Sequence, residues 1–137
     1  MKKYIISLLL SFLFGASYAQ SSNLSPVDNY VILTKKIQQL KPILLASGQL
    51  RSEFAHETGA IKIIICGKEV DQLTDVSIMS AFLEEASRLD VSLIACGFSL
   101  NKFKVDRQDV LPGINIVENG IFHNLKLQHQ GYLNLSL

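Results

Sequence analysis

Two short apolar runs, each closed by a cysteine and a glycine, constrain the fold of this chain more than any other feature. The first spans residues 61–66 (IKIIIC) before Gly67, and the second spans residues 91–96 (VSLIAC) before Gly97. Nearly continuous apolar runs of this length are typical of strands that are buried on both faces of a parallel sheet. The runs therefore predict two such strands, with Cys66 and Cys96 at their carboxyl ends.

Helical patterns lie between and before these runs. Between them, Asp75 can cap a helix with its side chain, and the apolar residues of that helix share one side: Val76, Met79, Phe82, Leu83 and Ala86. Residues 30–34 (YVILT) predict a short strand nearer the start of the chain. After it, apolar residues at three-and-four spacing predict a helix: Ile37, Leu40, Ile43, Leu44, Leu50 and Phe54. Pro42 either begins the main part of this helix in its first turn or kinks it.

The last third of the chain repeats the alternation of strand and helix. Residues 114–117 (INIV) predict a strand, Asn119 caps a helix over residues 120–130, and residues 132–135 (YLNL) predict a final strand. Parallel strands need a crossover, which is usually helical, so this order predicts an α/β protein with a parallel sheet and helices on both faces. A chain of 137 residues is enough for one such domain with a core of its own.

The N-terminus has the pattern of a secretory signal peptide. Lys2 and Lys3 precede an apolar stretch over residues 4–14, and small residues lead to a predicted cut between Ala19 and Gln20. A membrane span needs roughly 20 apolar residues, and this stretch is shorter. We therefore expect residues 1–19 to be removed, residues 20–27 to form a linker, and residues 28–137 to form an exported domain, periplasmic or secreted, with no membrane span after cleavage.

Charge and ligand patterns argue against several classes of protein. The 13 basic and 12 acidic residues leave a net charge of +1, and no basic run is present, which argues against a nucleic-acid partner. Two cysteines and scattered histidines lack the spacing of a zinc site, so no metal is expected. His123 and His129 are six residues apart rather than four. The chain also has no dinucleotide, phosphate-loop or Gly-x-Ser-x-Gly motif, so no cofactor is expected.

The order of these segments resembles the DsrE/DsrF family of small sulfur-relay proteins. The resemblance covers about residues 28–137 and includes IIICGKEV, VSLIACGFSL and DVLPGINIVENGIFHNLKLQHQGYLNL. Its most specific positions lie in the C-terminal segment: Leu111, Pro112, Gly113, Val117, Gly120, Gln128, Gly131 and Tyr132.

The resemblance implies a three-layer α/β/α domain with a mostly parallel five-stranded sheet, in which the second and third strands are neighbours. It also implies assembly into a homo-oligomer, a trimer or hexamer, and a cysteine after the third strand that carries sulfur as a persulfide. Cys96 matches that position. The best-known members work in the cytoplasm with a sulfur donor or acceptor protein, so the signal peptide of this chain is a departure from the family.

A sulfur carrier needs a thiolate, because the thiol is a poor nucleophile. A loop at Gly97 would expose the Cys96 sulfur, and a short helix from Phe98, with Lys102 and Lys104, would favour its anion. His123 is a weaker candidate for a place near this site.

Cys66 has two interpretations. It is either a resolving or disulfide partner of Cys96 in an oxidising compartment, or a core residue. Two functions remain open. One is a sulfur-relay or thiol-redox protein, either a sulfurtransferase or a sulfur carrier, that uses Cys96. The other is a non-catalytic oligomeric binding module with structural cysteines.

Overall fold

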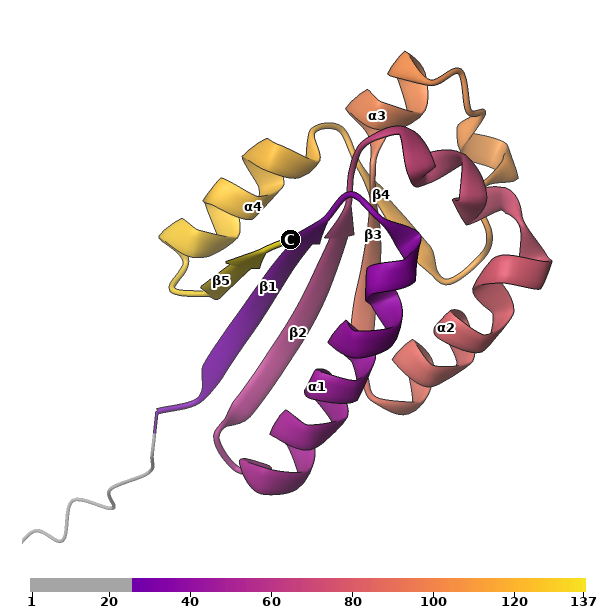
Figure 1. Ribbon diagram of the computed structural model, residues 1–137. Coiled ribbons are helices and arrows are strands. Elements are labelled where there is room, and N and C mark those ends of the chain that lie inside the picture. Colours follow the sequence, from indigo (N-terminus) through magenta and orange to yellow (C-terminus); the bar gives the residue numbers. More distant parts are fainter. Residues whose placement is uncertain (1–25) are drawn as a thin grey trace, which may run out of the picture.

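A five-stranded parallel sheet forms the centre of the protein (Figure 1), which a computed structural model describes for residues 26–137. The predicted signal peptide and most of the predicted linker lie outside the described residues. The strands are β1 (Asp28–Thr34), β2 (Thr58–Ile65), β3 (Val91–Cys96), β4 (Ile114–Val117) and β5 (Leu133–Ser136). Their order across the sheet is β4-β3-β2-β1-β5, and every neighbouring pair is parallel. The predicted α/β class, with a five-stranded sheet, is confirmed.

Helices cover both faces of this sheet (Figure 1), as the alternation of patterns predicted. The helices are α1 (Leu40–Glu53), α2 (Val76–Arg88), α3 (Gly97–Lys102) and α4 (Gly120–His129), with 3-10 turns η2 (Ile37–Gln39), η3 (Lys68–Thr74) and η4 (Arg107–Asp109). α1 and α2 lie on one face and α4 on the other. Because α4 connects β4 at one edge to β5 at the other, it crosses the strands between them. The three layers are therefore helices, sheet and helix.

The two faces of the sheet enclose two separate apolar clusters. Side chains alternate along each strand, so Ile63 and Leu93 enter the larger cluster under α1 and α2, while Ile64 and Ile94 enter the smaller one under α4. Both cysteines belong to the smaller cluster. The position of α4 therefore decides what surrounds them.

Capping residues and apolar spacing predicted where the helices lie, but they placed two exposed residues on buried faces. Asp75 caps α2 by accepting a hydrogen bond from the Ser77 N–H at 2.8 Å. Pro42 lies in the first turn of α1, after the short turn η2, which is the first of its two predicted positions. Phe54 and Val76, placed on buried helix faces by spacing, are both exposed, because Phe54 is the C-cap of α1 and Val76 begins α2.

The helices of residues 26–137 are all too short or too polar to cross a membrane.

Candidate functional site

The two cysteines lie side by side at the carboxyl edge of the sheet. β2 and β3 are hydrogen-bonded neighbours in register, with Ile65 opposite Ala95. Cys66 and Cys96 are the next residues along these two strands, and both side chains enter the cluster under α4. The sequence predicted that both cysteines stand at the carboxyl ends of neighbouring strands, and these positions are confirmed.

Gly120, the first residue of α4, contacts both cysteines. Its backbone N–H donates to the Cys96 Sγ at 3.2 Å. A Cβ at this position would lie 2.7 Å from the Cys66 Sγ, closer than real side chains approach, and 3.0 Å from the Cys96 Cβ. The Asn119 side chain caps the next two N–H groups of the helix, those of Ile121 and Phe122. The Gly120 N–H is thus left for the sulfur.

Both sulfur atoms are covered, contrary to the expectation that the loop at Gly97 would expose Cys96. Cys96 is 3% exposed and Cys66 is 5% exposed, and both are free thiols. The start of α4 lies against them, and Gly97 is itself enclosed, because a Cβ there would lie 2.8 Å from the Val117 carbonyl oxygen. A reagent therefore reaches Cys96 only when this edge opens locally.

The environment of Cys96 favours its thiolate. Burial by itself raises the pKa of the Cys96 thiol, but hydrogen bonds from the Ser99 side chain, the Gly120 N–H and the Cys66 thiol together outweigh burial and lower it. The expected contribution of Lys102 and Lys104 is absent from these causes, and Lys102 instead lies 5.7 Å from the centre of the Phe103 ring. Hydrogen bonding, rather than nearby lysines, stabilises the anion.

The environment of Cys66 favours its protonated thiol. Burial, then the charge of Cys96 and the hydrogen bond to it, raises the pKa of the Cys66 thiol from 9.0 to about 12, against a smaller lowering by Lys35. The pair is therefore asymmetric, because Cys96 loses its proton at a lower pH than Cys66 does.

This asymmetry predicts a two-step titration. In the reduced protein, thiolate absorbance in the ultraviolet should appear first at a pH below the ordinary thiol pKa and again only near pH 12. In Cys96→Ser, the Cys66 step should move down, because the neighbouring charge is gone, and still stay above 9.0, because burial remains. The variant without either cysteine supplies the tyrosine background. One combined step near the ordinary thiol pKa would contradict the asymmetry.

Ser99 and Gly120 complete the site, although neither was a candidate site residue in the sequence. The buried Ser99 hydroxyl accepts a hydrogen bond from the Gly67 N–H at 3.0 Å, which leaves its proton for Cys96. Two features of the sequence could have indicated these residues. Ser99 stands three residues after Cys96, and the helix-capping Asn119 directly precedes Gly120.

Neither cysteine has a histidine among its hydrogen-bond partners. His123 is half-buried, and burial together with the charges of Lys62 and Lys126 lowers its pKa. His56 and His129 are exposed. Among residues 26–137, no three of the His, Cys, Asp and Glu side chains gather as metal ligands.

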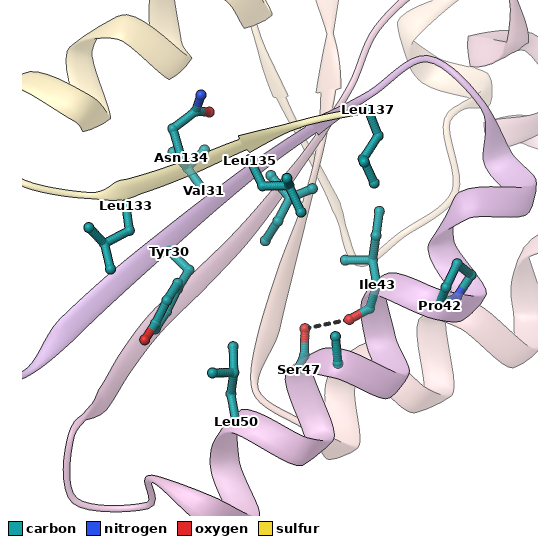
Figure 2. Close-up of a pocket in the computed structure, with 12 residues that line it drawn as sticks. Tyr30, Val31, Pro42, Ile43, Ser47, Leu50, Leu133, Asn134, Leu135 and Leu137 are labelled. Atoms are coloured by element: carbon teal, nitrogen blue, oxygen red, sulfur yellow. Dashed lines mark hydrogen bonds between the residues drawn. The ribbon is translucent and has the colours of Figure 1, made fainter.

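A concave feature lies on the face of the sheet opposite the cysteines, between α1 and the strands β1 and β5 (Figure 2). It is a groove of about 440 Å³ with an almost wholly apolar lining. Ser47, one of its few polar residues, donates its hydroxyl to the Ile43 carbonyl within α1 (Figure 2), at 2.9 Å. The groove therefore offers apolar contact and little polar chemistry, and it lies on the other side of the sheet from the cysteines.

These features define a three-layer α/β protein with a buried, asymmetric cysteine pair at the carboxyl edge of its sheet. Two solved structures share the fold. A protein of unknown function from Methanobacterium thermoautotrophicum has a TM-score of 0.62 and 23% identity, over 80% of this chain and 100% of that chain. A conserved protein of unknown function from Bacteroides thetaiotaomicron has a TM-score of 0.60 and 22% identity, over 80% and 95%. No protein-family model and no curated protein matches the chain.

Proposed function

We propose that this protein is a sulfur-relay or thiol-redox protein that accepts sulfane sulfur as a persulfide on Cys96. The observation that carries the proposal is the hydrogen bond from the Gly120 N–H to the Cys96 Sγ at 3.2 Å. A sulfur atom that accepts a backbone N–H at the start of a helix is stabilised as an anion. The lowered pKa of the Cys96 thiol agrees with this role.

The loading step is a transfer between two sulfur atoms without net oxidation. The Cys96 thiolate attacks the outer sulfur of a persulfide donor, the sulfur–sulfur bond of the donor breaks, and the donor leaves as a thiolate. The product is a persulfide anion on Cys96. Because Cys66 keeps its proton, it does not compete for the donor, and sulfur is loaded at one position only.

The resemblance to the DsrE/DsrF family supports the same residue and extends the proposal. It favours a homo-oligomer, a trimer or hexamer, and a donor or acceptor protein as partner. The signal-peptide pattern favours a location outside the cytosol for this activity. Exposed apolar side chains agree with assembly, since Ile121, Phe122 and Leu125 lie on the outer side of α4 and Phe122 is 66% exposed.

A matched pair of variants tests the loading step. Reduced Cys66→Ser protein, which keeps Cys96, should gain the mass of one sulfur atom when treated with glutathione persulfide. Reduced Cys96→Ser protein should gain none, because the pKa of the remaining thiol stays high and its burial is unchanged. Intact mass spectrometry measures the gain, and fragmentation places it on Cys96.

The second candidate function is a non-catalytic oligomeric binding module with structural cysteines, and the burial of both thiols favours it. Under that function, neither variant gains sulfur, although both remain folded by circular dichroism. That outcome would refute the sulfur-carrier proposal.

A further inference from the structure

Cys66 is a buried nucleophilic group that the loading step leaves unused. It lies beside Cys96 at the end of the neighbouring strand, and Gly120 contacts both residues. Adjacent strands are about 4.8 Å apart, and a disulfide requires roughly 4.4–6.8 Å between Cα atoms. In-register strand ends therefore meet the main distance requirement for a bridge without movement of the sheet.

We propose that Cys66 resolves the persulfide and that this protein releases the sulfur as sulfide. The Cys66 thiol passes its proton to the outer sulfur of the persulfide, and the resulting Cys66 thiolate attacks the Cys96 Sγ. A Cys66–Cys96 disulfide forms, and the bond from Cys96 Sγ to the outer sulfur breaks. The proton of the Cys66 thiol leaves with the outer sulfur, as hydrosulfide. The sulfane sulfur is reduced by two electrons, and the two cysteine sulfurs are oxidised to the disulfide, so the step needs no further oxidant.

The burial of Cys96 favours release of the sulfur as sulfide over its transfer to an acceptor protein. A sulfur on Cys96 is enclosed by the start of α4 and by Val117, so a large acceptor has no direct approach. Cys66, in contrast, already lies within the same apolar cluster. The nearest thiol is therefore an internal one, and attack within one chain has a high effective concentration.

The proposal also assigns a second partner by its chemistry. Each turnover leaves a disulfide, so a dithiol reductant must reopen it before Cys96 accepts sulfur again. The protein then consumes a persulfide and a dithiol and produces sulfide. The Cys66–Cys96 disulfide, one of the alternatives that the sequence left open, is then a transient product of each turnover.

This inference rests on the proposed function, and one single-turnover experiment distinguishes the two. Reduced protein is treated with glutathione persulfide, whose loading step releases glutathione and not sulfide. The wild-type chain should release one equivalent of sulfide and lose the mass of two hydrogen atoms. Cys66→Ser should keep the added sulfur and lose sulfide release, and Cys66→Ala, which lacks any side-chain donor, should behave in the same way.

Three outcomes would contradict the resolving role of Cys66, and one of them would also contradict the loading of sulfur on Cys96. If the wild-type chain keeps its persulfide as long as Cys66→Ser does, the resolving role is wrong and the loading role stands. If Cys66→Ser and Cys66→Ala are folded and gain no sulfur, both proposals are wrong. A glutathione adduct on Cys96 with sulfide release from Cys66→Ser would assign the sulfide to the donor and overturn the resolving role.

Discussion

Replacing Ile63 with alanine should lower the free energy of unfolding by about 2–5 kcal/mol, as large-to-small substitutions in packed cores do. Ile63 is 0% exposed and lies in β2, the middle strand of the sheet, against the helices α1 and α2. Alanine removes apolar contacts and leaves a cavity that neighbours on both sides cannot easily fill. The whole domain should therefore unfold at lower denaturant concentration.

Denaturant titration followed by circular dichroism measures this effect as a shift of the midpoint with an unchanged slope. Leu45→Ala is the matched control, because Leu45 is 61% exposed on α1 and its truncation should change stability by no more than about 0.5 kcal/mol. Equal effects of the two substitutions would mean that the core is not centred on β2.

The second large effect is expected from Gly120→Ala, which places a methyl group between the cysteines. The new Cβ would lie 2.7 Å from the Cys66 Sγ and 2.9 Å from the Ile64 Cγ2. These atoms belong to buried side chains at the end of β2 and directly after it, so the start of α4 must move instead. Overpacking of this kind costs about 1–3 kcal/mol. The same movement weakens the hydrogen bond from the Gly120 N–H to the Cys96 Sγ, so the pKa of the Cys96 thiol should rise.

Gly48→Ala is the control for this variant, because it adds the same methyl group to another helix. At Gly48 the new Cβ would meet Leu89 at 3.6 Å, an ordinary contact, and alanine inside a helix is favoured over glycine by about 0.5–1 kcal/mol. We therefore expect opposite signs for the two substitutions in denaturant titration. Thiolate absorbance should shift to higher pH only in Gly120→Ala. Wild-type stability together with an unchanged titration would remove Gly120 from the site.

The sequence patterns predicted all five strands of the sheet and the bounds of two of them. The predicted bounds of β3 and β4 match the structure, because each segment is a short apolar run between turn residues. The edge strand β5 begins at Leu133 rather than at residue 132, and its residues are exposed. Burial does not explain this difference, because β4 is the other edge strand and its bounds match, while the buried strand β2 begins at Thr58 rather than at residue 61.

Local signals in the sequence determined the elements, two helix caps and the placement of Cys66 and Cys96 at strand ends. They did so because strand periodicity and capping depend on residues close together in the chain. Only the tertiary structure decided that both thiols are covered and that Gly120 donates to Cys96. Those facts depend on how the β4–α4–β5 crossover returns over the sheet, which brings together residues 24 positions apart. The reactivity of the pair follows from burial and hydrogen bonds made across that distance, and no local pattern specifies them.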